Sequence, residues 1–203
     1  MVEIEKRFKL TECQFNNIKN FPLGWSSPYQ LTDIVFGNTG NPKLVFGGWI
    51  VRLREKKGNI VIGYKKPLNK KFDEWEEVNI EVNDFSSAMR FLLKIELSAD
   101  LVIDRIRTDC IWENFKLTLD CLKYLKEPYF LEIEIIDRNK NTDFNLFSTH
   151  FNIELGDFQP PYGEILLKEM ENNANICYEI SEYIKLKSGI TEVTTKMPNA
   201  QQT

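Results

Sequence analysis

The chain has 203 residues, the size of one globular domain, and 42% of them are hydrophobic, which is enough for a core and unlike a disordered chain. Its formal net charge of −4 argues against general nucleic-acid binding, which needs a basic face. The sequence has no apolar run near the roughly 18 residues of a membrane span and starts without a signal-peptide pattern, so we expect a cytoplasmic protein without a membrane segment.

The first predicted strand covers residues 2–10, where apolar and charged residues alternate strictly. A period of two over a short run predicts a β-strand with one apolar and one polar face. Residues 11–20 are polar and favour a short helix or a loop. Residues 29–36 are rich in β-forming residues and predict a second strand, which carries Asp33.

Three further strands are predicted to follow as a meander. Residues 48–56 alternate, the turn at 57–59 predicts a hairpin, and residues 60–66 return as its second strand. Residues 74–83 alternate again. The polar faces of these strands carry Arg52, Arg54, Lys56, Lys65, Glu77, Asn79 and Glu81.

A helix is predicted within residues 84–97, with Asp84 or Ser86 as its N-cap and apolar residues at helical spacing. Strands are then predicted at residues 101–112, 115–122 and 129–136. Their polar faces carry Arg105, Arg107, Asp109, Lys116, Thr118, Asp120, Glu132 and Glu134.

The C-terminal part of the chain has weaker patterns. We expect a further strand within residues 144–155, and helical spacing of apolar residues runs through 163–187. The end of the chain is polar. We therefore predict a single domain over residues 1–187 and a flexible tail over 188–203.

Many strands thus combine one apolar face with one charged face. A sheet with a solvated face explains any single strand, but the concentration of Arg-x-Arg and Glu-x-Glu pairs favours a closed antiparallel barrel with a polar interior. Charges inside a barrel must be paired, hydrated or matched to a ligand. Clustered carboxylates suit Mg²⁺ or Mn²⁺, and clustered Arg and Lys suit phosphate. Both sets in one cavity indicate a polyphosphate bound together with a divalent metal ion.

The opening E-x-E-x-R motif, formed by Glu3, Glu5 and Arg7, resembles the E-x-E-x-K signature of the CYTH superfamily, the triphosphate tunnel metalloenzymes. Further matches follow in the family's order over residues 2–166. They are Asp33 in D-x-x-F, Arg52 and Arg54 in R-L-R, Lys65 in K-K-P, the acidic strand from Glu77 to Glu81, Arg105 and Arg107 in R-x-R, Asp120 in L-D, Glu132 and Glu134 in F-L-E-I-E, and Tyr162. The resemblance implies an α+β fold: a closed antiparallel eight-stranded β-barrel, the triphosphate tunnel, with flanking helices.

The resemblance also implies roles for individual residues. The metal ligands it implies are Glu3, Glu5, Glu132 and Glu134, with Glu77 or Asp120 contributing. The triphosphate clamp it implies consists of Arg7, Arg52, Arg54, Lys65, Arg105 and Arg107. Of these residues, we expect Glu5, Arg7, Glu132 and Glu134 to be catalytic. Arg7 stands where the family usually has Lys, and the loss of a compact ammonium group weakens any acid–base role there.

The function that we expect is Mg²⁺- or Mn²⁺-dependent hydrolysis of a small triphosphate, such as tripolyphosphate, a nucleoside triphosphate or thiamine triphosphate. One alternative is a class IV adenylate cyclase, which forms cyclic AMP and pyrophosphate from ATP, and another is a non-catalytic tunnel that binds a nucleotide or polyphosphate. A homodimer is one assembly that we consider. Four cysteines without a C-x-x-C pair predict free thiols: Cys13, Cys110, Cys121 and Cys177.

Overall fold

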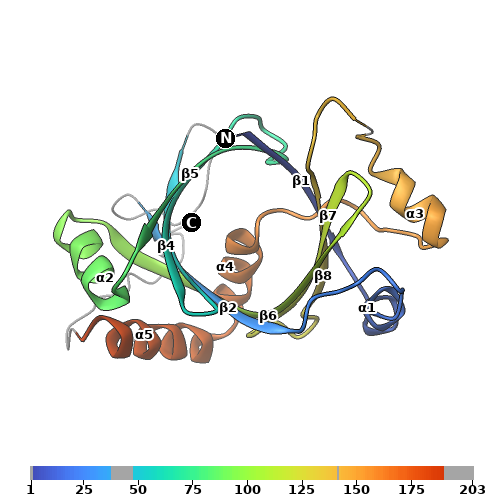
Figure 1. Ribbon diagram of the computed structural model, residues 1–203. Coiled ribbons are helices and arrows are strands. Elements are labelled where there is room, and N and C mark those ends of the chain that lie inside the picture. The colour runs from blue at the N-terminus through green and yellow to red at the C-terminus, as the bar shows by residue number, and fades with distance from the viewer. Residues whose placement is uncertain (1, 38–47, 141, 190–203) are drawn as a thin grey trace.

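Eight antiparallel strands form a closed barrel in the order β1-β5-β4-β3-β2-β6-β7-β8 (Figure 1). The computed structural model describes residues 2–37, 48–140 and 142–189. The strands are β1 (Val2–Lys9), β2 (Tyr29–Gly37), β3 (Ile50–Lys56), β4 (Asn59–Pro67), β5 (Glu74–Val82), β6 (Ser98–Trp112), β7 (Phe115–Leu122) and β8 (Tyr129–Ile135). This architecture confirms the predicted α+β fold with a closed eight-stranded barrel.

The first strand closes the barrel, because β1 pairs with β5 on one side and with β8 on the other. Its register places Glu5 opposite Glu134 and Arg7 opposite Glu132. Successive residues of a strand point to opposite faces, so the charged residues of β1 and β8 share the interior of the barrel.

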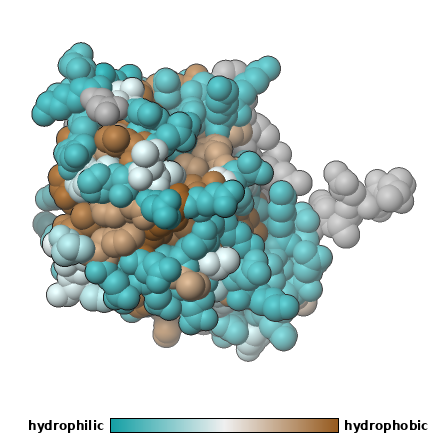
Figure 2. All heavy atoms as spheres, turned by 90° about the vertical axis from the view of Figure 1, so that its right-hand side faces the viewer, coloured by the Kyte–Doolittle hydropathy of each residue, from teal (hydrophilic) through white to brown (hydrophobic). Residues whose placement is uncertain are grey.

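Helices cover the outside of the barrel on two sides and border one end of its interior (Figure 1). They are α1 (Glu12–Lys19), α2 (Phe85–Lys94), α3 (Asn145–Phe151), α4 (Tyr162–Asn172) and α5 (Ala174–Ser188). The outward apolar residues of β7 and β8 form one buried cluster beneath α1 and α3. A second cluster joins β2, β3 and β6 to α2, α4 and α5. On the side with α1 and α3, apolar side chains also reach the surface between hydrophilic ones (Figure 2).

Capping residues explain where the first two helices begin. Thr11 and Gln14 form a capping box at the start of α1. Of the two alternatives for residues 11–20, a helix or a loop, the structure therefore has the helix. The Asp84 carboxylate accepts a hydrogen bond from the Ser87 backbone N–H at 2.6 Å, so Asp84 rather than Ser86 is the N-cap of α2.

The C-terminal part differs from the sequence prediction in two places. The strand expected within residues 144–155 is wrong, because this segment contains α3, whose Phe147 is buried against the barrel. The chain meets the edge of the barrel only after this segment, where Phe158 forms an isolated bridge with Phe8 of β1. The helical stretch 163–187 is two helices, and the Asn173 side chain between them accepts a hydrogen bond from the Asn175 N–H at the start of α5.

Other predictions concern the cysteines, the membrane and the tail. All four cysteines are free, as expected. In the described ranges, no helix combines the length and apolar character needed to cross a membrane. Residues 190–203, most of the predicted flexible tail, lie outside the described residues.

We expect Ile133→Ala to destabilise the protein by about 2–5 kcal/mol, the usual cost of truncating a buried Ile or Leu. Ile133 is 0% exposed in the cluster beneath α1 and α3. Urea denaturation measures the effect, with Ile111→Ala as the control because Ile111 is 60% exposed at the end of β6. Equal losses in the two variants would contradict the role given to this outer cluster.

Candidate functional site

The interior of the barrel contains a cavity of about 710 Å³ to which every strand contributes side chains. Among the described residues, its lining includes eight basic and seven acidic side chains. The basic residues are Arg7, Arg52, Arg54, Lys65, Arg105, Arg107, Lys116 and Arg138, and the acidic residues are Glu3, Glu5, Asp33, Glu77, Glu132, Glu134 and Glu164. We call this cavity the tunnel.

The structure brings together nearly all of the residues that the sequence indicated. The six residues of the predicted triphosphate clamp all line the tunnel, and so do five of the six predicted metal ligands. Asp120 is the exception: it is 0% exposed and is absent from the lining. It contacts Arg107 instead, across the β6–β7 pair.

Sequence reasoning placed Lys116 on a polar strand face without giving it a role in the site, and it missed Arg138; both line the tunnel. Lys116 had a usable signal, because it alternates with Thr118 and Asp120 on the inward face of β7. Arg138 lies beyond the end of β8, where no alternation applies.

Most of the tunnel's carboxylates contact a basic residue of the predicted clamp. The guanidinium of Arg7 donates to Glu132 Oε2 at 2.6 Å through Nη2 and at 3.1 Å through Nε, and Nη2 also lies 3.2 Å from Glu5 Oε1. Arg52 Nη2 donates to Glu77 Oε1 at 3.0 Å. The ion pairs in this part of the tunnel therefore join the two ligand-binding sets to each other.

Lys65 and Lys116 extend this pattern. Lys65 Nζ lies 2.7 Å from Glu3, 3.4 Å from Glu5 and 3.6 Å from Glu77. Lys116 forms an ion pair with Glu134, its cross-strand neighbour on β8.

Burial and charge pairing shift the pKa values of these groups in different directions. Burial alone would lower the pKa of Arg7, but Glu132 and Glu5 outweigh it and raise the pKa above its usual range. Burial opposes ionisation of Glu132, but Arg7 and Arg107 lower its pKa below the usual range. For Glu3, burial dominates and raises the pKa to about 7, although Lys65 opposes the shift. Arg7 is therefore a permanent cation, whereas Glu3 titrates near neutrality.

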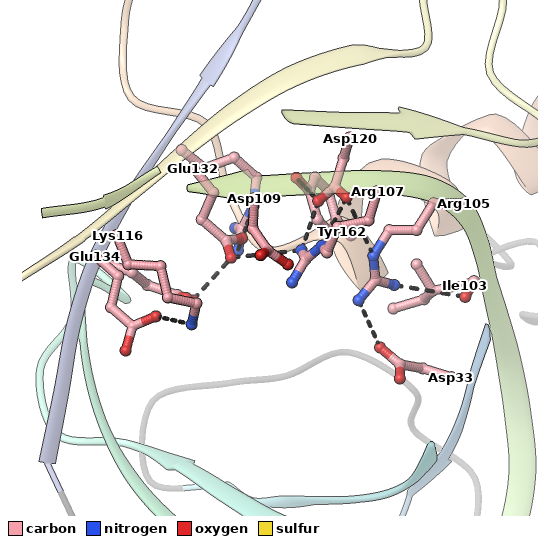
Figure 3. A network of polar contacts seen from close by, with 12 residues as sticks. Asp33, Ile103, Arg105, Arg107, Asp109, Lys116, Asp120, Glu132, Glu134 and Tyr162 are labelled. Atoms are coloured by element: carbon pink, nitrogen blue, oxygen red, sulfur yellow. Dashed lines mark hydrogen bonds and ion pairs between the residues drawn. The ribbon is translucent and has the colours of Figure 1, made fainter. Parts of the chain in front are cut away.

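A second network lies on the wall formed by β2, β3, β6 and β7 (Figure 3). Asp33 accepts two hydrogen bonds from Arg54, at 2.6 and 2.9 Å, and a third from Arg105 at 2.9 Å. Asp120 accepts two from Arg107, at 2.7 and 2.5 Å, and a third from the Tyr162 hydroxyl at 2.8 Å. Two buried carboxylates thus hold three arginines in place.

Glycine at position 63 lets side chains of neighbouring strands approach across β4. A Cβ atom there would lie 2.7 Å from Asn79 Oδ1 and 3.6 Å from Arg52 Nη2. Arg52 and Asn79 are the cross-strand neighbours of Gly63 on β3 and β5. Because glycine has no side chain, position 63 leaves room for Arg52 to reach Glu77.

Buried donors without partners indicate that the tunnel suits an anion. Arg52 Nε, Arg105 Nε and Trp75 Nε1 are buried and make no hydrogen bond within the described part of the chain. All three residues line the tunnel. A buried donor without an acceptor is costly, and phosphate oxygens are the acceptors that guanidinium groups match best.

The acidic residues suit a divalent metal ion in chemical type, because Mg²⁺ and Mn²⁺ prefer carboxylate oxygens. Over residues 2–37, 48–140 and 142–189, however, no three His, Cys, Asp or Glu side chains converge as a preformed metal site. The glutamates contact Lys and Arg instead. Metal binding would therefore require an exchange of ion pairs.

Comparisons with known proteins agree with the fold. A sequence model of the CYTH domain matches residues 1–158. The PH1012 protein of Pyrococcus horikoshii superposes with a TM-score of 0.67 at 21% identity, covering 80% of this chain and 98% of that protein. A candidate adenylate cyclase from Vibrio parahaemolyticus gives 0.58 at 22% identity over 82% and 98% of the two chains. A candidate adenylyl cyclase from Hippeastrum, described as having a dominant triphosphatase activity, gives 0.54 at 15% identity over 79% and 91%. A search of curated proteins found no match.

The raised pKa of Glu3 predicts how stability depends on pH. Between its ordinary value of 4.5 and about 7, the folded protein holds a proton on Glu3 that the unfolded chain has lost. The unfolded state then binds fewer protons, so the Glu3 contribution to stability falls as the pH rises through this window. Gln does not titrate. The melting temperature of Glu3→Gln minus that of wild type should therefore rise between pH 5 and 7 and stay constant above pH 7.

Thermal melts of both proteins at pH 5, 6, 7 and 8 measure this difference. The control is Glu76→Gln, because Glu76 is exposed on the same strand as Trp75 and Glu77. A difference between Glu3→Gln and wild type that stays constant with pH, or reverses, would contradict the burial-driven shift.

Proposed function

Because the chain belongs to the CYTH domain family, whose members process triphosphates, we propose that it is a divalent-metal-dependent triphosphatase. Its substrate would be a small molecule that carries a triphosphate group. The reaction would be in-line attack of water on the terminal phosphorus, with the rest of the phosphate chain as the leaving group.

One observation carries this proposal: a single tunnel is lined by eight basic and seven acidic side chains in the described part of the chain. A polyanion alone would need only the basic set, and a metal ion alone would need only the acidic set. The two sets side by side match a triphosphate with its metal ion, since the basic set binds phosphate oxygens and the acidic set binds the metal.

The acidic set would hold the metal ion through Glu3, Glu5, Glu77, Glu132 and Glu134, since all five line the tunnel. Bound Mg²⁺ or Mn²⁺ neutralises phosphate oxygens and lowers the pKa of its water. We do not include Asp120 in this set, because it is fully buried behind Arg107.

The basic set would bind and orient the phosphate chain. Arginine forks bind phosphate oxygens through two parallel hydrogen bonds, which fixes the chain for in-line attack. Arg7 remains protonated because Glu132 and Glu5 raise its pKa against the effect of burial, so it serves as a cation rather than as a base. Proton acceptance from the attacking water would then fall to a carboxylate, and Glu5 and Glu134 are better placed for it than Glu132, whose pKa Arg7 and Arg107 lower.

A second candidate is the cyclase reaction, in which the ribose hydroxyl of ATP attacks the α-phosphorus. Its support is the apolar part of the tunnel wall, formed by Val35, Ile50, Leu101 and Ile103, where a nucleoside could bind. Trp75 borders the same tunnel but is only 2% exposed, so it is mainly a packing residue. The Hippeastrum neighbour supports hydrolysis as the first choice, since its description combines the cyclase name with dominant triphosphatase activity.

Product analysis tests the two candidates. With Mg²⁺ or Mn²⁺, wild type should release orthophosphate from tripolyphosphate or a nucleoside triphosphate; cyclic AMP plus pyrophosphate from ATP would establish the cyclase instead. Glu132→Gln and Glu134→Gln should each lower kcat/KM by about 100-fold or more, the scale for losing a charge-stabilising group. Glu76→Gln on the outer face should not. Unchanged turnover in both tunnel variants would overturn the assignment.

The ion pairs also predict that metal ion and triphosphate bind cooperatively. Metal bound at Glu132 deprives Arg7 of its nearest carboxylate and leaves only Glu5, and phosphate bound at Arg7 deprives Glu132 of its nearest cation and leaves only Arg107. Binding both ligands removes both penalties, and linkage makes the coupling reciprocal. We expect Mg²⁺ to tighten binding of imidotriphosphate, a non-hydrolysable analogue, by about 10-fold, within the usual range for coupled sites.

Isothermal titration measures this coupling with and without Mg²⁺, after correction for complex formation between Mg²⁺ and the analogue in solution. The reverse titration, Mg²⁺ into protein with and without analogue, must give the same factor. Independent binding of the two ligands would show that the pairs between Arg7 and the glutamates do not oppose either ligand.

A further inference from the structure

Three of the arginines in the predicted clamp have an aspartate as their nearest acidic partner, although Arg107 Nη2 also lies 3.5 Å from Glu132 Oε1. Asp33 contacts both Arg54 and Arg105. Figure 3 shows Asp33 beside Arg105 and Asp120 beside Arg107, and one Asp120 oxygen lies 3.6 Å from Arg105 Nε. Arg105 therefore links the two carboxylates. We call this row, Arg54–Asp33–Arg105–Asp120–Arg107, the anchored row.

We propose that Asp33 and Asp120 are positioning residues that hold these arginines in binding geometry, and that neither aspartate ligates the metal ion. The proposal rests on the proposed function, because it gives the arginines the task of binding a triphosphate. It assigns a role to Asp33 and a different role from the expected one to Asp120.

Strand register builds the anchored row. Asp33 on β2 is the cross-strand neighbour of Arg54 on β3, and Arg107 on β6 is the neighbour of Asp120 on β7. Arg105 faces Leu31 on one side and Leu122 on the other, each two residues from an aspartate. Diagonal neighbours at this spacing are within reach of a long side chain. Arg105 therefore contacts both aspartates.

The coordination of the aspartates leaves little capacity for a metal ion. Both oxygens of Asp33 accept from the fork of Arg54, and both oxygens of Asp120 accept from the fork of Arg107. Their side chains are 2% and 0% exposed. A metal ion would have to displace a buried bidentate pair and leave an arginine unpaired, which is strongly unfavourable.

The pKa of Asp33 agrees with a permanent anion. Burial alone would raise it, but Arg54, Arg105 and Arg52 outweigh burial and lower the pKa well below its usual range. Asp33 therefore stays ionised and paired at neutral pH.

Positioning has a clear benefit for binding a polyanion. A free arginine side chain loses rotamer entropy when it binds a ligand. The anchors remove much of that cost beforehand and reduce repulsion between neighbouring guanidinium groups. Each fork uses Nε and Nη2, and Nη1 of Arg54 and Arg107 makes no hydrogen bond to any described residue, which leaves it available for phosphate.

Asp33→Asn tests the proposal through two separate readouts. The substitution should lower kcat/KM for tripolyphosphate by about 10-fold or more, because a neutral amide holds Arg54 and Arg105 less firmly. The Mg²⁺ concentration for half-maximal activity should stay within twofold of wild type. Glu134→Gln is the contrasting variant, in which that concentration should rise. A rise in Asp33→Asn equal to that in Glu134→Gln would overturn the proposal.

A double-mutant cycle separates positioning from general damage to the fold. Asp33→Asn lowers kcat/KM by a certain factor in wild type. In the Arg54→Gln background that factor should be at least five times smaller, because the main partner of Asp33 is already absent. Equal losses in both backgrounds would contradict the proposal. Should Asp33→Asn alone fail to fold, the double variant removes the pair together, and its Mg²⁺ requirement must still match that of Arg54→Gln.

The outcome also distinguishes this proposal from the proposed function. A wild-type protein without turnover would contradict the triphosphatase assignment but leave binding measurable. Titration of imidotriphosphate into metal-free wild type and Asp33→Asn would then decide the role of Asp33. Weaker binding in the variant supports the anchored row, and equal binding contradicts it.

Discussion

Closure of the barrel forces one face of every strand into a shared interior, and in this protein that face is charged. Charges removed from water must find partners, and the partners available here are other side chains of the tunnel. The described lining is nearly balanced, with eight basic and seven acidic residues, and Asp120 lies directly behind it. This pairing offsets part of the cost of burying the charges, and it leaves ion pairs that a charged ligand can exchange.

The paired charges divide into two groups with different physical character. The glutamates of β1, β5 and β8 contact flexible or shared cations such as Lys65 and Arg7. The aspartates of β2 and β7 contact arginine forks in fixed bidentate geometry. A cation of the first group is shared between carboxylates, as Lys65 is between Glu3 and Glu5, whereas each aspartate of the second group is held by one bidentate fork. Such a division suits a site in which some residues must move to a metal ion and others must stay in place.

Much of this arrangement could be predicted from the sequence, because alternation along a strand shows which residues share its inward face. Glu3, Glu5 and Arg7 share one face of β1 by alternation alone, and all three line the tunnel. Alternation could not predict which inward side chains reach the cavity. Asp120 alternates like a lining residue but lies behind Arg107. Alternation also could not predict the structure of segment 144–155, because its apolar residues pack as the helix α3 against the outer cluster rather than as a strand.

The pairing of β1 with β8 has a consequence for biosynthesis. Arg7 leaves the ribosome 125 residues before its partner Glu132. A nascent chain therefore carries the charged and apolar faces of β1 without their neighbours during most of translation. Pairings this distant in sequence are slow to form, and an open strand edge invites pairing with other chains. Completion of the tunnel is then one of the last events of folding, and truncated chains that lack β8 would have no tunnel at all.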